Sequence, residues 1–314
     1  MPTVVDDVQL WCIERAQVYE QHSLIMVGES RIQLGIDPQV IRDRLPHHNV
    51  VQLALDGRNP IATLIDLCED PKVDGTVLCS LNTQMIMNRQ SWQAQREYVQ
   101  RFRDGLSVNT WMNRQMATFV QARCSFRNPQ VSLKRILASV ARDGKLPRPA
   151  YVTTRSDRSR VADYSLTDTR KLTPDWVTNG ISPDTSQIDV SEVRAFVQAV
   201  ETLRPAVEAL KRRGGQVVFI RMPTSAERFR IEEQRWPRVQ FWNQIAELTG
   251  AAAVHFGDHA ALAAFDCPDS SHLDGADAPA FTEALIATMH QNGLLSPLDT
   301  DVVASSNTAI PRGQ

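Results

Sequence analysis

Four short stretches of this chain carry the residue types that acyl transfer requires. In chain order they are Gly28-Glu29-Ser30, Gly57, Ser80-Leu81-Asn82 and Asp269-Ser270-Ser271-His272. A serine can attack a carbonyl carbon, a histidine can take its proton, and an aspartate can fix the imidazole tautomer. The sequence therefore predicts Ser30 as nucleophile, His272 as base and Asp269 as the acid that orients it.

The same stretches could also stabilise the oxyanion of a tetrahedral intermediate. The backbone N–H groups of Ser30 and Gly57 and the side-chain amide of Asn82 could supply three donors. One such donor is typically worth about 3–4 kcal/mol in the transition state. Gly57 carries no side chain that would keep a substrate oxygen from its amide.

The candidate residues follow segments that have strand character. Short, apolar, β-branched runs cover 23–27, 49–55, 75–79 and 216–220, and a weaker run covers 252–255. Such runs are typical of buried parallel strands. Ligands bind at the carboxyl ends of an open parallel sheet, so we expect the four stretches to meet there.

Helical patterns alternate with these strands. They cover 59–67, 191–213, 225–233, 237–248 and 278–291. This alternation predicts an α/β protein with a three-layer α/β/α arrangement around a central parallel sheet, flavodoxin-like in its general plan.

The alternation of strand and helix patterns is interrupted between residues 83 and 189. We predict a core domain from 1–82 and 190–295, and a long insertion at 83–189 that could form a lid. Helical periodicity covers 92–103, 110–126 and 131–142, whereas 146–188 reads as mostly irregular. Aromatic residues of the insertion, including Trp111 and Tyr164, either pack in its core or stack on sugar rings. The tail, 296–314, has little to bury and is expected to be disordered.

The four stretches resemble the sequence blocks of the SGNH, or GDSL-type, hydrolases, in the family's order. The resemblance covers roughly 20–82 and 190–292, and it implies a serine esterase or acyltransferase with the triad Ser30, His272 and Asp269. Two positions depart from the family pattern. Glu29 stands where the family has Asp, and Ser80 stands where the third block has Gly, which could shift the Asn82 loop.

The residues after Ser30, from Arg31 to Pro38, resemble a bacterial branch of this family. Some members of that branch act in O-acetylation of cell-envelope polysaccharides, as the alginate acetylation proteins do. The resemblance implies a small ester or carbohydrate substrate and an anionic glycan as a further partner. It also implies an exported or anchored protein, and so a periplasmic or cell-envelope location as the alternative to the cytoplasm.

Two arginines are candidate substrate-binding residues. Arg31 adjoins the nucleophile, and Arg221 follows a predicted strand toward the same rim. Either could bind a carboxylate or phosphate through two hydrogen bonds, and a structural ion pair is the alternative for both. The proposed chemistry needs no metal or organic cofactor. His255 and His259 would have metal-ligand spacing on a helix, but Gly257 favours a loop.

Bulk properties limit the remaining possibilities. Five cysteines without a CxxC pair argue against a disulfide framework and a zinc site. No apolar run is long enough for a membrane span, and we identify no signal peptide, so a soluble, cytoplasmic protein is the default expectation. No nucleic-acid partner is expected. Residues 83–189 contain 17 Lys+Arg and 9 Asp+Glu, so this segment is basic.

Two other functions stay open. The chain could retain the fold but bind an anionic polysaccharide or act in an envelope assembly through its basic insertion. It could also be an unrelated flavodoxin-like binding domain, in which case Ser30 and His272 would lie more than roughly 8 Å apart.

Overall fold

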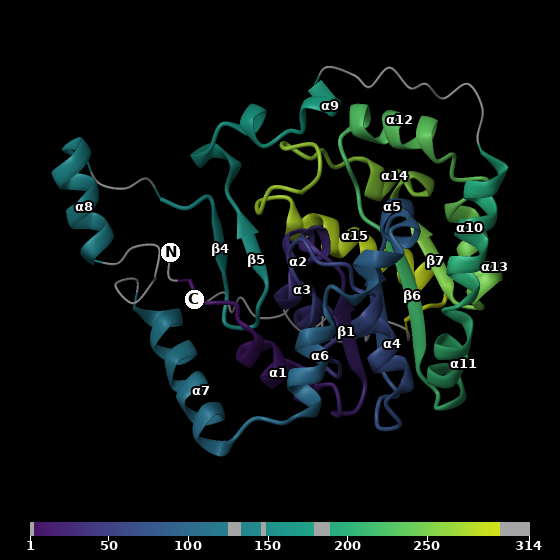
Figure 1. The fold of residues 1–314 in the computed structure, drawn as a ribbon, viewed down its shortest axis with the longest axis horizontal. Helices are drawn as coiled ribbons and strands as arrows, with labels where there is room; N and C mark the ends of the chain where they lie inside the picture. The colour runs from purple at the N-terminus through teal and green to yellow at the C-terminus, as the bar shows by residue number, and fades with distance from the viewer. Residues whose placement is uncertain (1–2, 125–132, 146–148, 179–188, 296–314) are drawn as a thin grey trace, which may run out of the picture.

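The computed structural model describes residues 3–124, 133–145, 149–178 and 189–295. Its centre is a twisted sheet with helices on both sides, and two helices of the 83–189 segment project from one side (Figure 1). The predicted three-layer α/β/α fold is confirmed.

Five parallel strands form the sheet, in the order β2-β1-β3-β6-β7. Their bounds are β1 Ser23–Val27, β2 Asn49–Gln52, β3 Thr76–Ser80, β6 Gln216–Arg221 and β7 Ala252–His255. The chain moves outward to β2 and then crosses β1 to reach β3. The carboxyl ends of β1 and β3 are therefore adjacent, which brings the Ser30 and Asn82 loops to one edge of the sheet.

Alternate residues of each strand pack into two separate cores. In β1, Ile25 and Val27 enter one core, whereas Leu24 and Met26 enter the other. Side chains of successive strand residues point to opposite faces, so a strand that is apolar at every position needs helices on both sides. This explains why the strand segments read as continuous apolar runs.

Two sets of helices cover these cores. The Val27 face packs against α1 Val8–Gln17, α4 Ile61–Glu69, α6 Arg96–Arg103, α10 Val190–Glu201, α11 Arg204–Arg212 and α13 Ile245–Thr249. The Leu24 face packs against α2 Ser30–Gly35, α3 Pro38–Arg44, α14 Ala260–Ala263 and α15 Ala278–Gln291.

Two predicted helices differ from the observed ones. The segment 191–213 is two helices, α10 and α11, because Pro205 cannot donate the backbone hydrogen bond that a continuous helix would need. In the segment 237–248, the chain forms only the 3-10 turn η6 Trp242–Gln244 and the beginning of α13. The helix α12 Ala226–Arg235 lies close to its predicted position.

The segment predicted as irregular contains a short antiparallel hairpin. It comprises β4 Val152–Thr154 and β5 Arg160–Ala162, followed by the 3-10 turn η4 Tyr164–Leu166. Arg158 in its turn is fully buried and donates to the carbonyl oxygens of Gln52 (2.6 Å) and Ala54 (3.0 Å). The hairpin is thus fastened to the end of β2.

The hairpin also contacts the loop that carries His272. The Gly275 N–H donates to the Ala162 carbonyl oxygen at 2.7 Å. A β-carbon on Gly275 would lie 2.8 Å from that oxygen, so this contact requires glycine.

Two further helices of the 83–189 segment, α7 Val108–Arg123 and α8 Leu133–Asp143, lie at the side of the molecule away from β7 (Figure 1). In the described part of the chain, no helix has both the length and the apolar content needed to cross a membrane. The 296–314 tail and its predicted disorder lie outside the described residues.

Glu14 on α1 is a buried carboxyl group whose charge is costly. Burial raises its pKa to about 7 from an ordinary 4.5, although the positive charge of Arg158 opposes the shift. The folded state therefore holds this proton more tightly than the unfolded state. The contribution of this group to the free energy of unfolding is therefore fully present below about pH 4.5 and is lost as the pH rises through 7.

We predict that Glu14→Gln raises the free energy of unfolding at pH 8 by about 2–3 kcal/mol, from the size of that shift. Near pH 4.5 the variant and the parent should be equally stable, because Glu14 is then protonated. Urea unfolding at the two pH values measures the difference, and a gain that is equal at both would contradict this account.

Candidate active site

Ser30 lies at the carboxyl end of β1, as predicted, and is the first residue of α2. The turn before it is tight. A β-carbon on Gly28 would lie 2.5 Å from the Ile32 side chain and 2.9 Å from the β-carbon of Ser80. Glycine at position 28 therefore lets β1, α2 and the end of β3 pack together, and Ser80 fits because residue 28 has no side chain.

Ser30, His272 and Asp269 form a continuous hydrogen-bonded chain. Ser30 Oγ lies 2.7 Å from His272 Nε2, and His272 Nδ1 lies 2.8 Å from Asp269 Oδ2. The serine and aspartate are mostly buried, whereas the imidazole side chain keeps 20% of its surface exposed. The distance contradicts the unrelated binding-domain alternative, which required a separation above roughly 8 Å.

The protonation of this chain follows from Asp269. Burial alone would raise the pKa of its carboxyl group, but hydrogen bonds from His272, the Ser271 N–H and Tyr164 outweigh burial and lower the pKa to about 2. An ionised carboxylate only accepts hydrogen bonds, so Nδ1 of a neutral His272 carries the proton. Its Nε2 is then free to accept the Ser30 proton.

Hydrogen bonds within the Asp269–His272 loop fix its conformation. Asp269 Oδ1 accepts hydrogen bonds from the backbone N–H groups of Ser271 (2.9 Å) and His272 (2.8 Å). Ser270, which directly follows Asp269, has a φ of 75°, a left-handed conformation that is uncommon outside glycine. Asp269 and His272, three residues apart, therefore meet through an Asx turn and not through a helical turn.

Glu29 also reaches the nucleophile. Its Oε2 lies 3.2 Å from Ser30 Oγ, and its Oε1 lies 3.4 Å from Arg31 Nε. The serine has one hydroxyl proton and two acceptors, of which His272 is the nearer. The longer side chain at position 29 thus adds a second acceptor beside the nucleophile, a contact that the sequence did not indicate.

The predicted oxyanion residues lie on the loops that flank Ser30. Gly57 has a φ of 66°, and an added β-carbon would meet no atom within 4 Å, so its surroundings are open. Asn82 caps α5 Thr83–Met87, because its Oδ1 accepts from the Met85 N–H at 2.8 Å. This bond commits the amide oxygen and leaves the amide nitrogen as the donor. Their joint role as oxyanion donors stays a prediction.

Gln95, a residue of the 83–189 segment, joins the Ser30 and Gly57 loops. This fully buried amide donates to the carbonyl oxygens of Gly28 and Arg58, each at 3.2 Å. Gly28 lies two residues before Ser30, and Arg58 directly follows Gly57. Gln95 therefore fixes the nucleophile turn relative to the predicted oxyanion loop, and no sequence pattern pointed to it.

Tyr164 contacts the triad through Asp269. Its hydroxyl group donates to Asp269 Oδ2 at 2.8 Å, and its backbone N–H donates to Asp274 Oδ2 at 3.0 Å. Burial, together with the nearby Asp269 charge, raises the pKa of the phenol, which keeps it a donor. Tyr164 is buried, so its role differs from the sugar stacking considered for it.

We predict that Tyr164→Phe lowers kcat/KM for an ester substrate by about tenfold, the worth of one hydrogen bond to a charged group. The effect should fall mainly on kcat, because the phenol contacts Asp269 and not the substrate. Tyr151→Phe is a suitable control, since its ring packs against Tyr164 and lies outside the triad. Equal losses in both variants would contradict the role assigned to the hydroxyl group.

Both candidate substrate arginines are buried and paired. Arg221 forms an ion pair with Glu232 on α12, and Arg31 donates to Ser271 Oγ at 3.1 Å and lies 4.0 Å from Glu232. Arg228 Nε contacts the same carboxylate at 2.9 Å. Burial would raise the pKa of Glu232, but the three arginines lower it to about 2. These contacts favour the ion-pair alternative, and a role in substrate binding stays a prediction.

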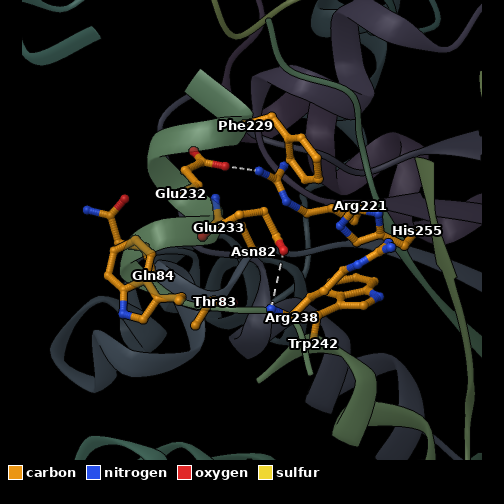
Figure 2. A pocket seen from close by; sticks show the side chains of 11 residues that line it. Asn82, Thr83, Gln84, Arg221, Phe229, Glu232, Glu233, Arg238, Trp242 and His255 are labelled. Atoms are coloured by element: carbon orange, nitrogen blue, oxygen red, sulfur yellow. Dashed lines mark hydrogen bonds and ion pairs between the residues drawn. The ribbon is translucent and has the colours of Figure 1, made fainter. Parts of the chain in front are cut away.

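A small cavity of about 20 Å³ lies between Asn82 and the Arg221–Glu232 pair (Figure 2). That volume corresponds to roughly one or two water molecules. Its wall also contains neutral polar, charged and aromatic side chains, which are Thr83, Gln84, Phe229, Glu233, Trp236, Arg238, Trp242 and His255.

His255 belongs to this wall and stays neutral. Burial lowers its pKa to about 3, aided by the positive charges of Arg221 and Arg238. Its Nδ1 accepts from the Gly257 N–H at 3.0 Å and so caps the 3-10 turn η7 Phe256–Asp258. The sequence favoured a loop here, and this expectation was wrong, because one short 3-10 turn accommodates Gly257. The described residues contain no group of three or more His, Cys, Asp or Glu side chains arranged to hold a metal ion.

Comparison with known proteins finds two distant structural likenesses. No family model and no curated protein matches the chain. Among solved structures, TesA shares 13% identity over 87% of this chain and 99% of its own, with a TM-score of 0.38. A provisionally assigned arylesterase from Agrobacterium tumefaciens str. C58 shares 14% over 86% and 99%, with a TM-score of 0.36. At these values neither likeness carries an argument about this chain.

Proposed function

We propose that this protein is a serine-dependent ester hydrolase or O-acyltransferase of the SGNH type. The observation that carries the proposal is the chain from Ser30 through His272 to Asp269, with contacts of 2.7 and 2.8 Å at the carboxyl end of the sheet. These contacts place a base beside the serine and an orienting acid beside the base, which is the arrangement that nucleophilic acyl transfer needs.

In the first half of the reaction, Ser30 Oγ attacks the ester carbonyl carbon as its proton moves to His272 Nε2. The imidazolium that forms is stabilised by Asp269, and the oxyanion is stabilised by the N–H groups of Ser30 and Gly57 and the Asn82 amide. When the intermediate collapses, the bond to the alkoxide breaks and His272 gives its proton to the departing oxygen. An acyl group stays on Ser30.

In the second half, an acceptor hydroxyl attacks the acyl-enzyme and gives its proton to His272. Collapse returns the proton to Ser30 Oγ and releases the product. With water as acceptor the reaction is hydrolysis; with a sugar hydroxyl it is acyl transfer. The resemblance of the segment after Ser30 to polysaccharide O-acetylation proteins favours a carbohydrate acceptor.

The acyl group we propose is small, such as acetyl. The cavity beside Asn82 has a volume of about 20 Å³, and Trp236 and Trp242 are part of its lining. We place the acyl group in this cavity because Asn82, one of the proposed oxyanion donors, is part of its lining. Its charged wall also disfavours a long apolar chain.

Turnover of an aryl acetate tests the proposal, with aryl butyrate and aryl octanoate as size controls. We expect acetate to be preferred and product ratios to shift toward the acetylated acceptor when a soluble oligosaccharide is added. Absence of turnover with all three esters would contradict the proposal. A preference for octanoate would contradict only the assignment of the cavity beside Asn82 as the acyl-binding site, and would leave the esterase proposal standing.

A further inference from the structure

Helix α7 exposes an apolar stripe along its whole length. Residues of this stripe recur at helical spacing, and their exposed fractions reach 74% at Val108, 66% at Met116 and 58% at Phe119. The remaining members are Trp111, Met112 and Val120. Sixteen residues give a helix of about 24 Å, so the stripe is a ridge of that length.

The orientation of α7 is the reverse of that in an ordinary surface helix. Its polar face turns inward: Arg114 and Thr118 are buried, and Gln121 Oε1 accepts from the Val5 N–H at 3.1 Å. Helices on globular proteins usually turn their apolar side to the core. Because polar contacts fix this helix to the body, its apolar face is exposed in the described structure. Large exposed apolar patches mark interaction sites.

The charge of this region indicates what the stripe contacts. Helices α7 and α8 together contain five arginines or lysines and one aspartate. On α7, Arg114 is buried against the body, whereas Arg123 is exposed. Arg123 at the end of α7 lies with its guanidinium 3.7 Å from the centre of the Phe119 ring. On α8, Leu137 and Val140 are also exposed. An apolar ridge with aromatic residues and adjoining cations is typical of helices that lie in the surface of a bilayer.

We propose that α7 docks this protein on an anionic lipid surface, with Trp111, Met116 and Phe119 inserted among the acyl chains. Fluid acyl chains adapt to a convex ridge. A second copy would need an apolar groove instead, and the cavities beside Asn82, Asp56 and His47 are lined mainly by polar and charged side chains. A glycan would bind to aromatic faces and arginines and would gain little from the exposed methionine and valine side chains.

Sedimentation with lipid vesicles tests this proposal. The intact protein is mixed with vesicles of phosphatidylcholine containing phosphatidylglycerol, or of phosphatidylcholine alone, at low and high salt. We expect binding to the anionic vesicles that weakens with salt. Trp111→Ser/Phe119→Ser should weaken it about tenfold or more, because two large apolar side chains are lost from the contact.

The matched control is Val190→Ser/Val239→Ser, which removes two apolar side chains that are equally exposed elsewhere on the surface and should leave binding unchanged. Met116→Gln, on the same ridge, should weaken binding in the manner of the double variant. Failure to bind anionic vesicles, or equal binding by the double variant, overturns the proposal. A dimer that Trp111→Ser/Phe119→Ser converts to a monomer in light scattering also overturns it, in favour of a contact between two copies.

Discussion

Ser30→Ala is expected to lower kcat/KM for an aryl acetate by a factor on the order of 10⁴ or more, with the fold unchanged. The substitution removes the atom that attacks the carbonyl carbon, and removal of a triad nucleophile leaves only the contribution of the oxyanion donors and substrate binding. Stability should change little, because the lost hydroxyl group makes contacts only with His272 and Glu29 in the described structure.

Steady-state kinetics and thermal unfolding of the same preparations check this expectation. Ser191→Ala on α10 is the matched control, since its hydroxyl group is exposed and bonds only locally to Asp189. The control should keep full activity. If Ser30→Ala kept more than a tenth of the parent kcat/KM, another residue would be the nucleophile.

Asp269→Asn is expected to lower kcat by about 10³ to 10⁴. The amide can donate to Nδ1, and His272 would then carry its proton on Nε2, where it cannot accept the Ser30 proton. The change also has a cost in stability. The pKa of Asp269 is lowered to about 2 from 3.8, so its contribution is present above pH 3.8 and is lost as the pH falls through 2. At pH 7 this contribution amounts to about 2 kcal/mol.

Asp266→Asn is the control, because Asp266 is exposed and lies three residues earlier on the same loop. It should change neither kcat nor stability. A loss of stability in Asp269→Asn without a loss of kcat would mean that Asp269 only holds the loop, and that His272 acts without an orienting acid.

The sheet could be predicted because its strands are buried on both faces. Residues such as Ile25 and Leu24 face different cores, so the strand reads as an uninterrupted apolar run. The expectation that the candidate residues meet at one edge of the sheet then followed from a general rule: ligands bind at the carboxyl ends of parallel strands. In contrast, the apolar pattern predicts one helix across Pro205, whereas the chain breaks into two helices just before this proline.

The supporting contacts of the site could not be predicted in the same way. Tyr164 and Asp269 are 105 residues apart, and Gln95 reaches the Gly28 carbonyl oxygen across 67 residues. Their partners are backbone atoms or a single carboxylate, which leave no periodic pattern in the sequence. The hairpin that positions Tyr164 has strands of three residues, which are too short to show alternation.

The departures from the family pattern have local explanations. Ser80 packs its β-carbon against Gly28, and the Leu81 N–H donates to the Ile220 carbonyl oxygen at 3.1 Å, so the chain leading to Asn82 is fixed to β6. Glu29 lies between Ser30 and Arg31. Both side chains are accommodated without a break in the contacts from Ser30 to Asp269.

Covalent labelling with a fluorophosphonate, followed by mass spectrometry of the digested protein, tests the central claim most directly. The reagent reacts with a serine only where a neighbouring base activates it, so its position identifies the nucleophile. We expect one adduct on the peptide that carries Ser30, and none in Ser30→Ala or at the other serines. Labelling at a different serine, or no labelling of the folded protein, would contradict the assignment of Ser30 as the nucleophile.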